Sequence, residues 1–313
     1  MFSSRVTRRI ALASSVLAAA VLGACSSSDS ASTTNLTVTP ALGAVYGGEV
    51  NVYNAAGGLL GTGTTSTTTG SASVVLNGYS AGTPIIVKRS MINGSKYYDE
   101  KSKTVKPVTV ASGATATSLL SFAPSITSGA AVGVTPASHM AAKLAGLSTT
   151  TLTGGVTLSA ATILKAVGAA NLILGLPSGT NLLKAPVPAT SDTPPTDTYG
   201  ALLFAVAKVA TVDALSQATA LYDAVPAMAA DGSVSITDNT KYATIVAANK
   251  AMVDAKPTLL TSSIPATVSA GSPLTLTASQ VTTASTNVSS NISNTASGSG
   301  SGTGSASGTN QAF

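Results

Sequence analysis

The chain has 313 residues, of which 9% are charged and 4% aromatic, and its formal net charge is +5. Without Arg5, Arg8 and Arg9 near its start, 13 basic and 11 acidic residues leave a net charge of about +2, which excludes the basic footprint of a nucleic-acid-binding protein. A single cysteine and a single histidine exclude a disulfide framework and a zinc site with several Cys or His ligands.

Residues 1–24 have the three parts of an export signal in order. Arg5, Arg8 and Arg9 give a positive start, and an apolar run from Ile10 to Leu22 follows. This run is too short to span a bilayer stably as a helix. Small residues then lead to Cys25. The pattern predicts a signal peptide that is removed during export.

The stretch Leu22-Gly23-Ala24-Cys25 resembles the lipobox of bacterial lipoproteins. In that family the cysteine receives a diacylglyceryl group, the leader is cut before it, and the new amine is acylated. The resemblance implies lipidation of Cys25 by fatty acids such as palmitate. It also implies a membrane as a partner, to which this N-terminal lipid anchors the protein. Ser26, in place of an aspartate, implies the outer membrane in a Gram-negative host. A plain secretory signal with an incidental cysteine is the alternative.

Strand signals begin soon after Cys25. Residues 25–34 are small and polar, which predicts a flexible tether. From residue 35 to residue 124, runs rich in β-branched residues alternate with clusters of Gly, Asn and Ser. The clearest runs are Leu36–Thr39, Glu49–Tyr53, Ser73–Leu76 and Pro84–Lys88. This spacing predicts a small β-sandwich.

The order of these runs resembles a known type of module. A valine-rich strand, a glycine turn, a Gly-Thr-Thr strand and a long apolar strand follow one another in GGEVNVYNAAGGLLGTGTTSTTTGSASVVLNGYSAGTPIIVKR. This order is similar to that of the carboxypeptidase-regulatory-like, transthyretin-like modules of bacterial surface proteins, which are not catalytic as a family. An immunoglobulin-like sandwich of another topology is the alternative.

Helical periodicity replaces the strand pattern in residues 125–260. Thr135 before Pro136 is a hydroxyl cap followed by proline at the first helical position. An amphipathic stripe over residues 158–174 predicts a second helix. Three further helices are expected. One begins after a cap at Asp197 or Thr198, one covers residues 215–225, and one that includes residues 242–253 ends at Pro257. Four or five such Ala-rich helices would form a small bundle.

Residues 261–313 are mostly Ser, Thr, Ala and Gly, and we expect a low-complexity, mostly disordered tail, with one strand between Val268 and Leu276. The predicted fold class is therefore α+β. It consists of an N-terminal small β-sandwich, an Ala-rich helical bundle and a disordered Ser/Thr/Gly tail.

No catalytic pattern emerges from the residue types that carry chemistry. His139 is the only histidine, lies in an Ala-rich helix without an acidic neighbour in sequence, and is expected to be structural. Asp99 and Glu100 stand among lysines, which favours a solvated turn. Asp231 and Asp238 match only half of a calcium loop, because Ala227 and Ala229 occupy ligand positions. We therefore expect no metal and no cofactor.

These observations favour a non-enzymatic, membrane-anchored envelope lipoprotein with an interaction or structural role. Its partner would be an envelope protein or a glycan. The alternative is a surface module that binds glycan or peptidoglycan, with Tyr97 and Tyr98 as an exposed stacking face. A hydrolase that depends on His139 is a third hypothesis.

Overall fold

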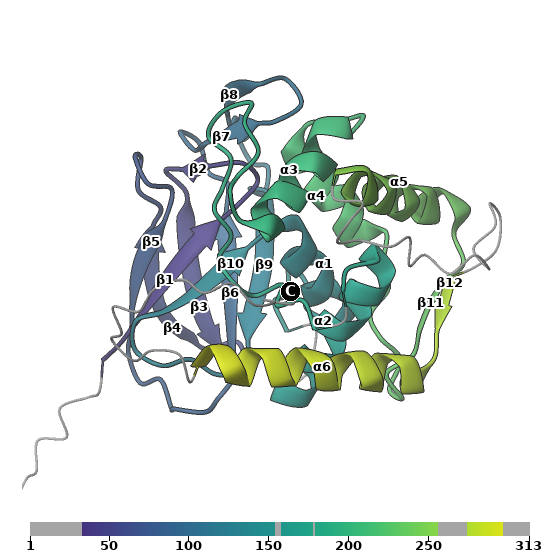
Figure 1. Ribbon diagram of the computed structural model, residues 1–313. Coiled ribbons are helices and arrows are strands. Elements are labelled where there is room, and N and C mark those ends of the chain that lie inside the picture. The colour runs from purple at the N-terminus through teal and green to yellow at the C-terminus, as the bar shows by residue number, and fades with distance from the viewer. Residues whose placement is uncertain (1–32, 154–157, 178, 256–273, 297–313) are drawn as a thin grey trace, which may run out of the picture. The chain divides into compact units, whose positions relative to one another are not determined.

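A computed structural model describes residues 33–153, 158–177, 179–255 and 274–296. These residues form both strands and helices, so the predicted α+β class is confirmed (Figure 1). The strands are β1 (Thr34–Pro40), β2 (Val45–Tyr46), β3 (Glu49–Asn54), β4 (Leu59–Thr64), β5 (Ala72–Leu76), β6 (Ile85–Ser90), β7 (Lys96–Asp99), β8 (Thr104–Pro107), β9 (Ser118–Ala123), β10 (Ala130–Val134), β11 (Val234–Ile236) and β12 (Leu274–Leu276). The helices are α1 (Pro136–Leu144), α2 (Ala160–Leu174), α3 (Thr198–Val209), α4 (Ala214–Asp223), α5 (Asn239–Ala255) and α6 (Ala278–Ala296).

Two sheets share an apolar core. One has the strand order β4-β3-β6-β9 and the other has the order β10-β1-β5. Alternation explains which side chains meet between them, because successive residues of a strand point to opposite faces. One buried cluster contains side chains from both sheets: Val50 of β3 and Val87 of β6 from the first, and Leu36 of β1 and Val74 of β5 from the second.

Strand β1 is paired along both of its edges. It runs antiparallel to β5, with Thr34 opposite Leu76, and parallel to β10, with Leu36 opposite Ala130. The sequence pattern predicted that strands give way to helices after residue 124, but β10 is a strand that follows this boundary. The pairing of β1 with β10 brings the chain back across the sheet immediately before α1 begins.

The predicted helices between residues 135 and 257 are confirmed, and their first turns are capped by side chains. In α1, the Thr135 hydroxyl accepts from the Ser138 N–H at 3.0 Å and the Ser138 hydroxyl accepts from the Thr135 N–H at 2.9 Å, a reciprocal capping box. Asp197 caps α3, and Asp213 caps α4. These caps provide acceptors for N–H groups that have no partner inside the helix.

Helices cover the second face of the four-stranded sheet. All six residues of β9 are buried, because alternate side chains face the first core and the helices. Phe122 of β9 and Ile86 of β6 pack in one cluster with Met140 of α1 and Val167 of α2. The sheet thus lies between the three-stranded sheet and the helices, and the described strands and helices share their cores.

The expectation of disorder after residue 261 is wrong for residues 274–296. Strand β12 pairs with β11, with Val234 opposite Leu276, and lies at the end of the strand predicted up to Leu276. Helix α6 then lies along α2 and buries Val281, Ala284 and Val288. The average composition concealed this narrow apolar stripe, whose members recur every three or four residues. The rest of the predicted tail lies outside the described residues.

No helix in the described ranges has the length and apolar character needed to cross a bilayer. The predicted signal peptide and Cys25 lie outside the described residues.

Candidate functional site

Tyr97 and Tyr98 are buried, which corrects the prediction that they form an exposed ligand face. They are 5% and 4% exposed. Neighbouring residues of a strand point to opposite faces, and both faces of β7 are covered. Tyr98 packs against Ala189 and Phe204, whereas the Tyr97 hydroxyl donates to Asp213 Oδ1 at 3.0 Å. Neither ring can therefore stack on a sugar.

Carboxylates join β7 to the first turn of α4. Asp213 accepts the hydrogen bond from Tyr97 and caps α4 by accepting from the Ser216 N–H at 3.0 Å. Asp99 Oδ1 accepts from the Ala214 N–H at 3.0 Å, and its Oδ2 forms an ion pair with Lys106 Nζ at 2.7 Å. We call these contacts, made by Tyr97, Asp99, Asp213 and Ala214, the β7–α4 junction.

Hydrogen bonds keep the two acids of the junction ionised. Burial acts to raise the pKa of Asp99, but the hydrogen bonds from Lys106, Ser102 and the Ala214 N–H outweigh it and hold the pKa below its ordinary value. Burial and hydrogen bonding act in the same opposed way on Asp213, whose pKa is also lowered. Negative charge at the start of α4 is further favoured by the helix dipole.

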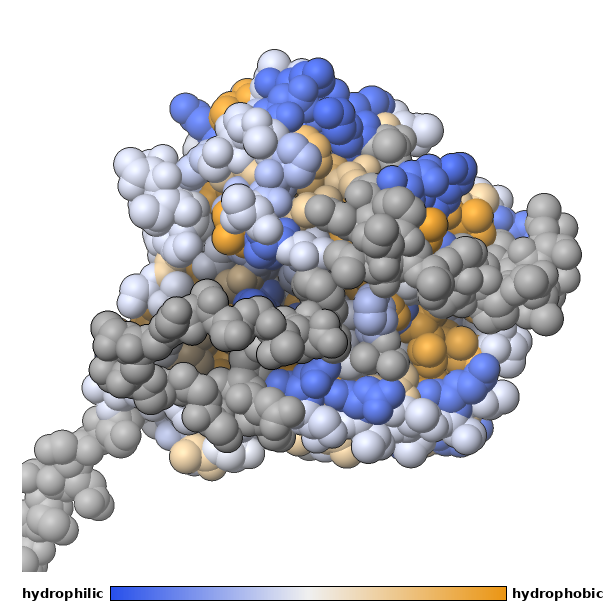
Figure 2. All heavy atoms as spheres, viewed as in Figure 1, coloured by the Kyte–Doolittle hydropathy of each residue, from blue (hydrophilic) through white to orange (hydrophobic). Residues whose placement is uncertain are grey.

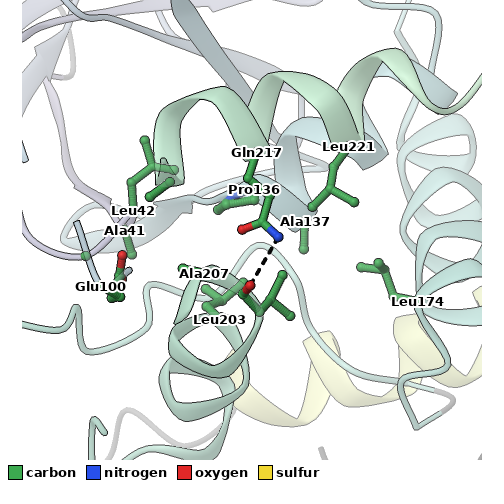
Figure 3. Close-up of a pocket in the computed structure, with 13 residues that line it drawn as sticks. Ala41, Leu42, Glu100, Pro136, Ala137, Leu174, Leu203, Ala207, Gln217 and Leu221 are labelled. Carbon is green, nitrogen blue, oxygen red and sulfur yellow. Dashed lines mark hydrogen bonds between the residues drawn. The ribbon is translucent and has the colours of Figure 1, made fainter. Parts of the chain in front are cut away.

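Glu100 lies at one end of a small cavity beside the junction (Figure 3). The cavity has a volume of about 20 Å³ and lies between α3 and α4, with Leu203, Gln217 and Leu221 in its lining. Such a volume holds about one water molecule. Glu100 is 2% exposed, and its Oε2 has no hydrogen-bond partner in the described part of the chain. The sequence-based prediction of a solvated turn for Asp99 and Glu100 is therefore wrong.

Burial raises the pKa of the Glu100 carboxyl to about 8, and the charge of neighbouring Asp99 acts in the same direction. Adjacent carboxyl groups thus have opposite shifts. Asp99 is bonded to a lysine and stays charged, whereas Glu100 faces mainly apolar side chains and holds its proton at neutral pH.

Arg89 is a second buried titratable side chain without a partner, and it lies inside the core between the two sheets. It is fully buried, and its three guanidinium nitrogens have no hydrogen-bond partner among the described residues. Burial lowers its pKa to about 9. Gly48 lies against the guanidinium, and an added Cβ at Gly48 would overlap it. A side chain at residue 48 and the arginine therefore exclude one another.

His139 has a structural role in the packing of α1 on the sheet. Its Nδ1 accepts from the Leu120 N–H at 3.0 Å, and its ring stacks on Tyr222 at a centroid distance of 4.2 Å. Burial, with a smaller effect from Lys143, lowers its pKa to about 3, so the ring is neutral at physiological pH. Nδ1 is already engaged by a backbone donor and is not free to accept a proton from a nucleophile.

Metal-ligand geometry is absent from the described ranges, where no three His, Cys, Asp or Glu side chains come together. The two aspartates of the partial calcium loop serve local turns. Asp231 accepts from the Ser233 N–H at 2.8 Å, and Asp238 accepts from the Thr240 N–H at 2.9 Å. Both side chains thus accept hydrogen bonds from backbone N–H groups, Asp231 at a turn and Asp238 at the start of α5.

Hydrophilic side chains gather at the top of the molecule in the view of Figure 2, where Figure 1 draws the antiparallel hairpin of β7 and β8. Ion pairs offset much of the charge there, because Lys103 and Lys208 both bind Asp192, at 2.7 and 2.9 Å, and Lys106 binds Asp99. An open groove of about 300 Å³ runs beside this hairpin, lined by Tyr97, Asp213 and exposed threonines. Because Asp213 is already paired, the groove offers mainly neutral hydroxyl groups.

Comparison of the chain with known protein families, with curated proteins and with solved structures finds no match.

The burial of Glu100 and Arg89 was missed by sequence reasoning, although the pattern around Arg89 indicates it. Arg89 follows Ile85 and Val87 at alternate positions of β6, so strand alternation alone points it toward the core. No comparable signal exists for Glu100, because it follows the last residue of β7 and is covered by residues far away in sequence.

Proposed function

We propose that the protein is a non-enzymatic, lipid-anchored lipoprotein of the bacterial envelope with an interaction or structural role. The observation that carries this proposal is the order of positive, apolar and small residues that ends at Leu22-Gly23-Ala24-Cys25. Acylation of Cys25 would attach two or three chains, which hold a protein far more durably than one chain does. With Ser26 after the cysteine, the proposed location is the outer membrane of a Gram-negative host.

The start of the fold is consistent with a short anchor. Strand β1 begins at Thr34, so residues 26–33 would connect the lipid to the first strand. At full extension, this eight-residue segment would span about 28 Å. Such a tether would keep the folded residues close to the membrane surface.

The non-enzymatic part of the proposal is supported by the state of the acid and base groups. His139 is buried and neutral, and Asp99 and Asp213 serve as partners of backbone N–H groups. The glycan-binding alternative loses the stacking face predicted for it at Tyr97 and Tyr98, because both side chains are buried. We also infer that the two core-sharing sheets are the carboxypeptidase-regulatory-like module that the sequence resembles.

Metabolic labelling with a palmitate analogue tests the anchor. We expect the wild type to be labelled and recovered with membranes, and Cys25→Ala to lose the label and remain in the uncleaved form or leave the membrane fraction. Ser26→Ala is the matched control and should keep the label. Equal labelling of Cys25→Ala and the wild type would refute the anchor.

A partner search tests the interaction role. The protein is cross-linked in intact cells, recovered from detergent-solubilised envelopes, and compared with Cys25→Ala, while protease added to intact cells reports which side of the membrane it faces. We expect a defined envelope component that is enriched with the wild type and lost with Cys25→Ala. Turnover of an envelope substrate by the purified protein, abolished by His139→Ala, would contradict the non-enzymatic proposal.

A further inference from the structure

The cavity at Glu100 lies where strands and helices meet. Its lining comes from the segment after β1 (Ala41–Gly43), from the start of α1, and from α3 and α4, with Leu174 of α2 opposite Glu100 (Figure 3). Any charge on Glu100 therefore acts on the packing of all these elements at once.

The carboxyl group faces surroundings that cannot neutralise a negative charge. Gln217 is the other side chain with polar atoms in the lining, and its Nε2 already donates to the Val206 carbonyl at 3.1 Å. The backbone N–H groups of Glu100 itself and of Gly43 favour the charged form, but burial outweighs them, and Oε2 has no partner among the described residues. No ion pair joins Glu100 to a lysine or arginine in the described ranges.

Several acids and phenols lie near Glu100. Asp99, Tyr98 and Tyr97 of β7 precede it, and Asp213 of α4 is bonded to Tyr97. The neighbouring lysines have other partners: Lys106 is paired with Asp99, Lys103 is paired with Asp192, and Lys101 Nζ donates to the Thr211 carbonyl. The residues of α1, α2 and α3 in the lining are apolar. The field at Glu100 therefore opposes a second negative charge.

We propose that Glu100 is a pH-responsive element of the fold, and that loss of its proton loosens the packing of α3 and α4 against the strands. The tightly packed state holds the proton because a carboxylate would be desolvated in the cavity. When the helices move away, water reaches the carboxyl group and the proton is released. Opening is thus coupled to the release of one proton.

The direction of the effect follows from linkage. The pKa of Glu100 is about 8 when the helices are packed, against an ordinary value of 4.5 when water reaches the carboxyl group. Below about pH 4.5, both states are protonated and pH has no effect through this group. Between about pH 4.5 and pH 8, the packed state alone holds the proton, so each unit of rising pH favours opening up to tenfold. Above about pH 8 both states are charged and the effect levels off.

Hydrogen exchange of the backbone amides of α4 in the full-length protein, with detergent present, tests this proposal. After correction for intrinsic exchange rates, the opening constant of the wild type should rise up to about 100-fold more than that of Glu100→Gln between pH 5.5 and pH 7.5. Glu49→Gln, at an exposed glutamate, is the matched control and should behave like the wild type. Equal pH dependence in the wild type and Glu100→Gln would overturn the proposal.

A titration of the wild type alone decides the matter if the variant does not fold. The side-chain carboxyl carbon of Glu100 is followed by NMR from pH 4 to pH 10. A midpoint between about pH 7 and pH 9 supports the proposal, because the packed state must hold the proton through neutral pH. A midpoint below about pH 5.5 would overturn it.

Discussion

The unpaired arginine in the core leads to a prediction with an unusual sign: replacing Arg89 with methionine should stabilise the protein. Methionine keeps most of the apolar stem and removes a cation that has no partner among the described residues. A lowering of the Arg89 pKa from 12.5 to about 9 corresponds to a cost of about 5 kcal/mol in the folded state. Replacing buried ionic groups by apolar ones of similar volume stabilises by about 1–4 kcal/mol. We therefore expect a gain of about 2–4 kcal/mol at pH 7.

The same shift gives the gain a pH dependence. The folded state binds the Arg89 proton less tightly than the unfolded state does, so wild-type stability rises with pH above about pH 9 until the unfolded arginine also titrates. Arg89→Met has no such rise. The advantage of the variant should therefore shrink by about 2 kcal/mol between pH 7 and pH 10.5.

Urea unfolding of the wild type, Arg89→Met and Lys88→Met at both pH values measures these differences. Lys88 is the matched control, because it precedes Arg89 in β6 but is half-buried and donates to the Thr149 carbonyl at 2.8 Å. Lys88→Met should give no gain. A lower free energy of unfolding in Arg89→Met than in the wild type would refute the reasoning, since it would mean that the guanidinium is compensated in the folded state.

Two further predictions concern helix contacts. Gly168→Leu should cost about 2–3 kcal/mol, roughly the burial of one valine of α6, because an added Cβ would come within 2.8 Å of the Ser285 backbone nitrogen. Hydrogen exchange should show faster exchange in α6, whereas the exposed control Ala160→Leu, at the start of α2, should leave exchange in α6 unchanged. Tyr97→Phe removes the hydrogen bond to Asp213 and should cost about 1–2 kcal/mol. This bond helps lower the Asp213 pKa, so the loss in free energy of unfolding should diminish as the pH falls through that pKa. Urea unfolding at several pH values measures this loss, and a loss that does not change with pH would contradict the prediction.

Local signals in the sequence were sufficient to predict helices α1 to α5. Thr135 and Pro136 mark the start of α1, and the cap at Asp197 begins α3 as expected. These signals succeed because a cap satisfies backbone groups only three residues away. Strands β1, β3, β5 and β6 follow from their β-branched residues for a similar local reason.

Contacts between distant residues determined what the sequence did not reveal. Tyr98 is buried by residues that lie about 90 to 105 positions later, and Glu100 by residues that lie from about 60 positions earlier to about 120 positions later, and no local pattern encodes that coverage. Helix α6 was missed for a different reason. Its Ser, Thr and Asn residues have low helix propensity, and its packing against α2 and the capping box formed by Thr277 and Gln280 compensate for this.

The place of β1 in the sheet has a mechanical consequence. The chain enters the described fold at Thr34, directly into a strand that is bonded to β5 on one edge and to β10 on the other. Tension along the preceding segment would pull β1 along its own axis, so the hydrogen bonds of both ladders would share the load simultaneously instead of breaking one after another. Under the lipid anchor proposed above, force transmitted from a membrane would therefore enter the fold at a strand that is hydrogen-bonded along both edges.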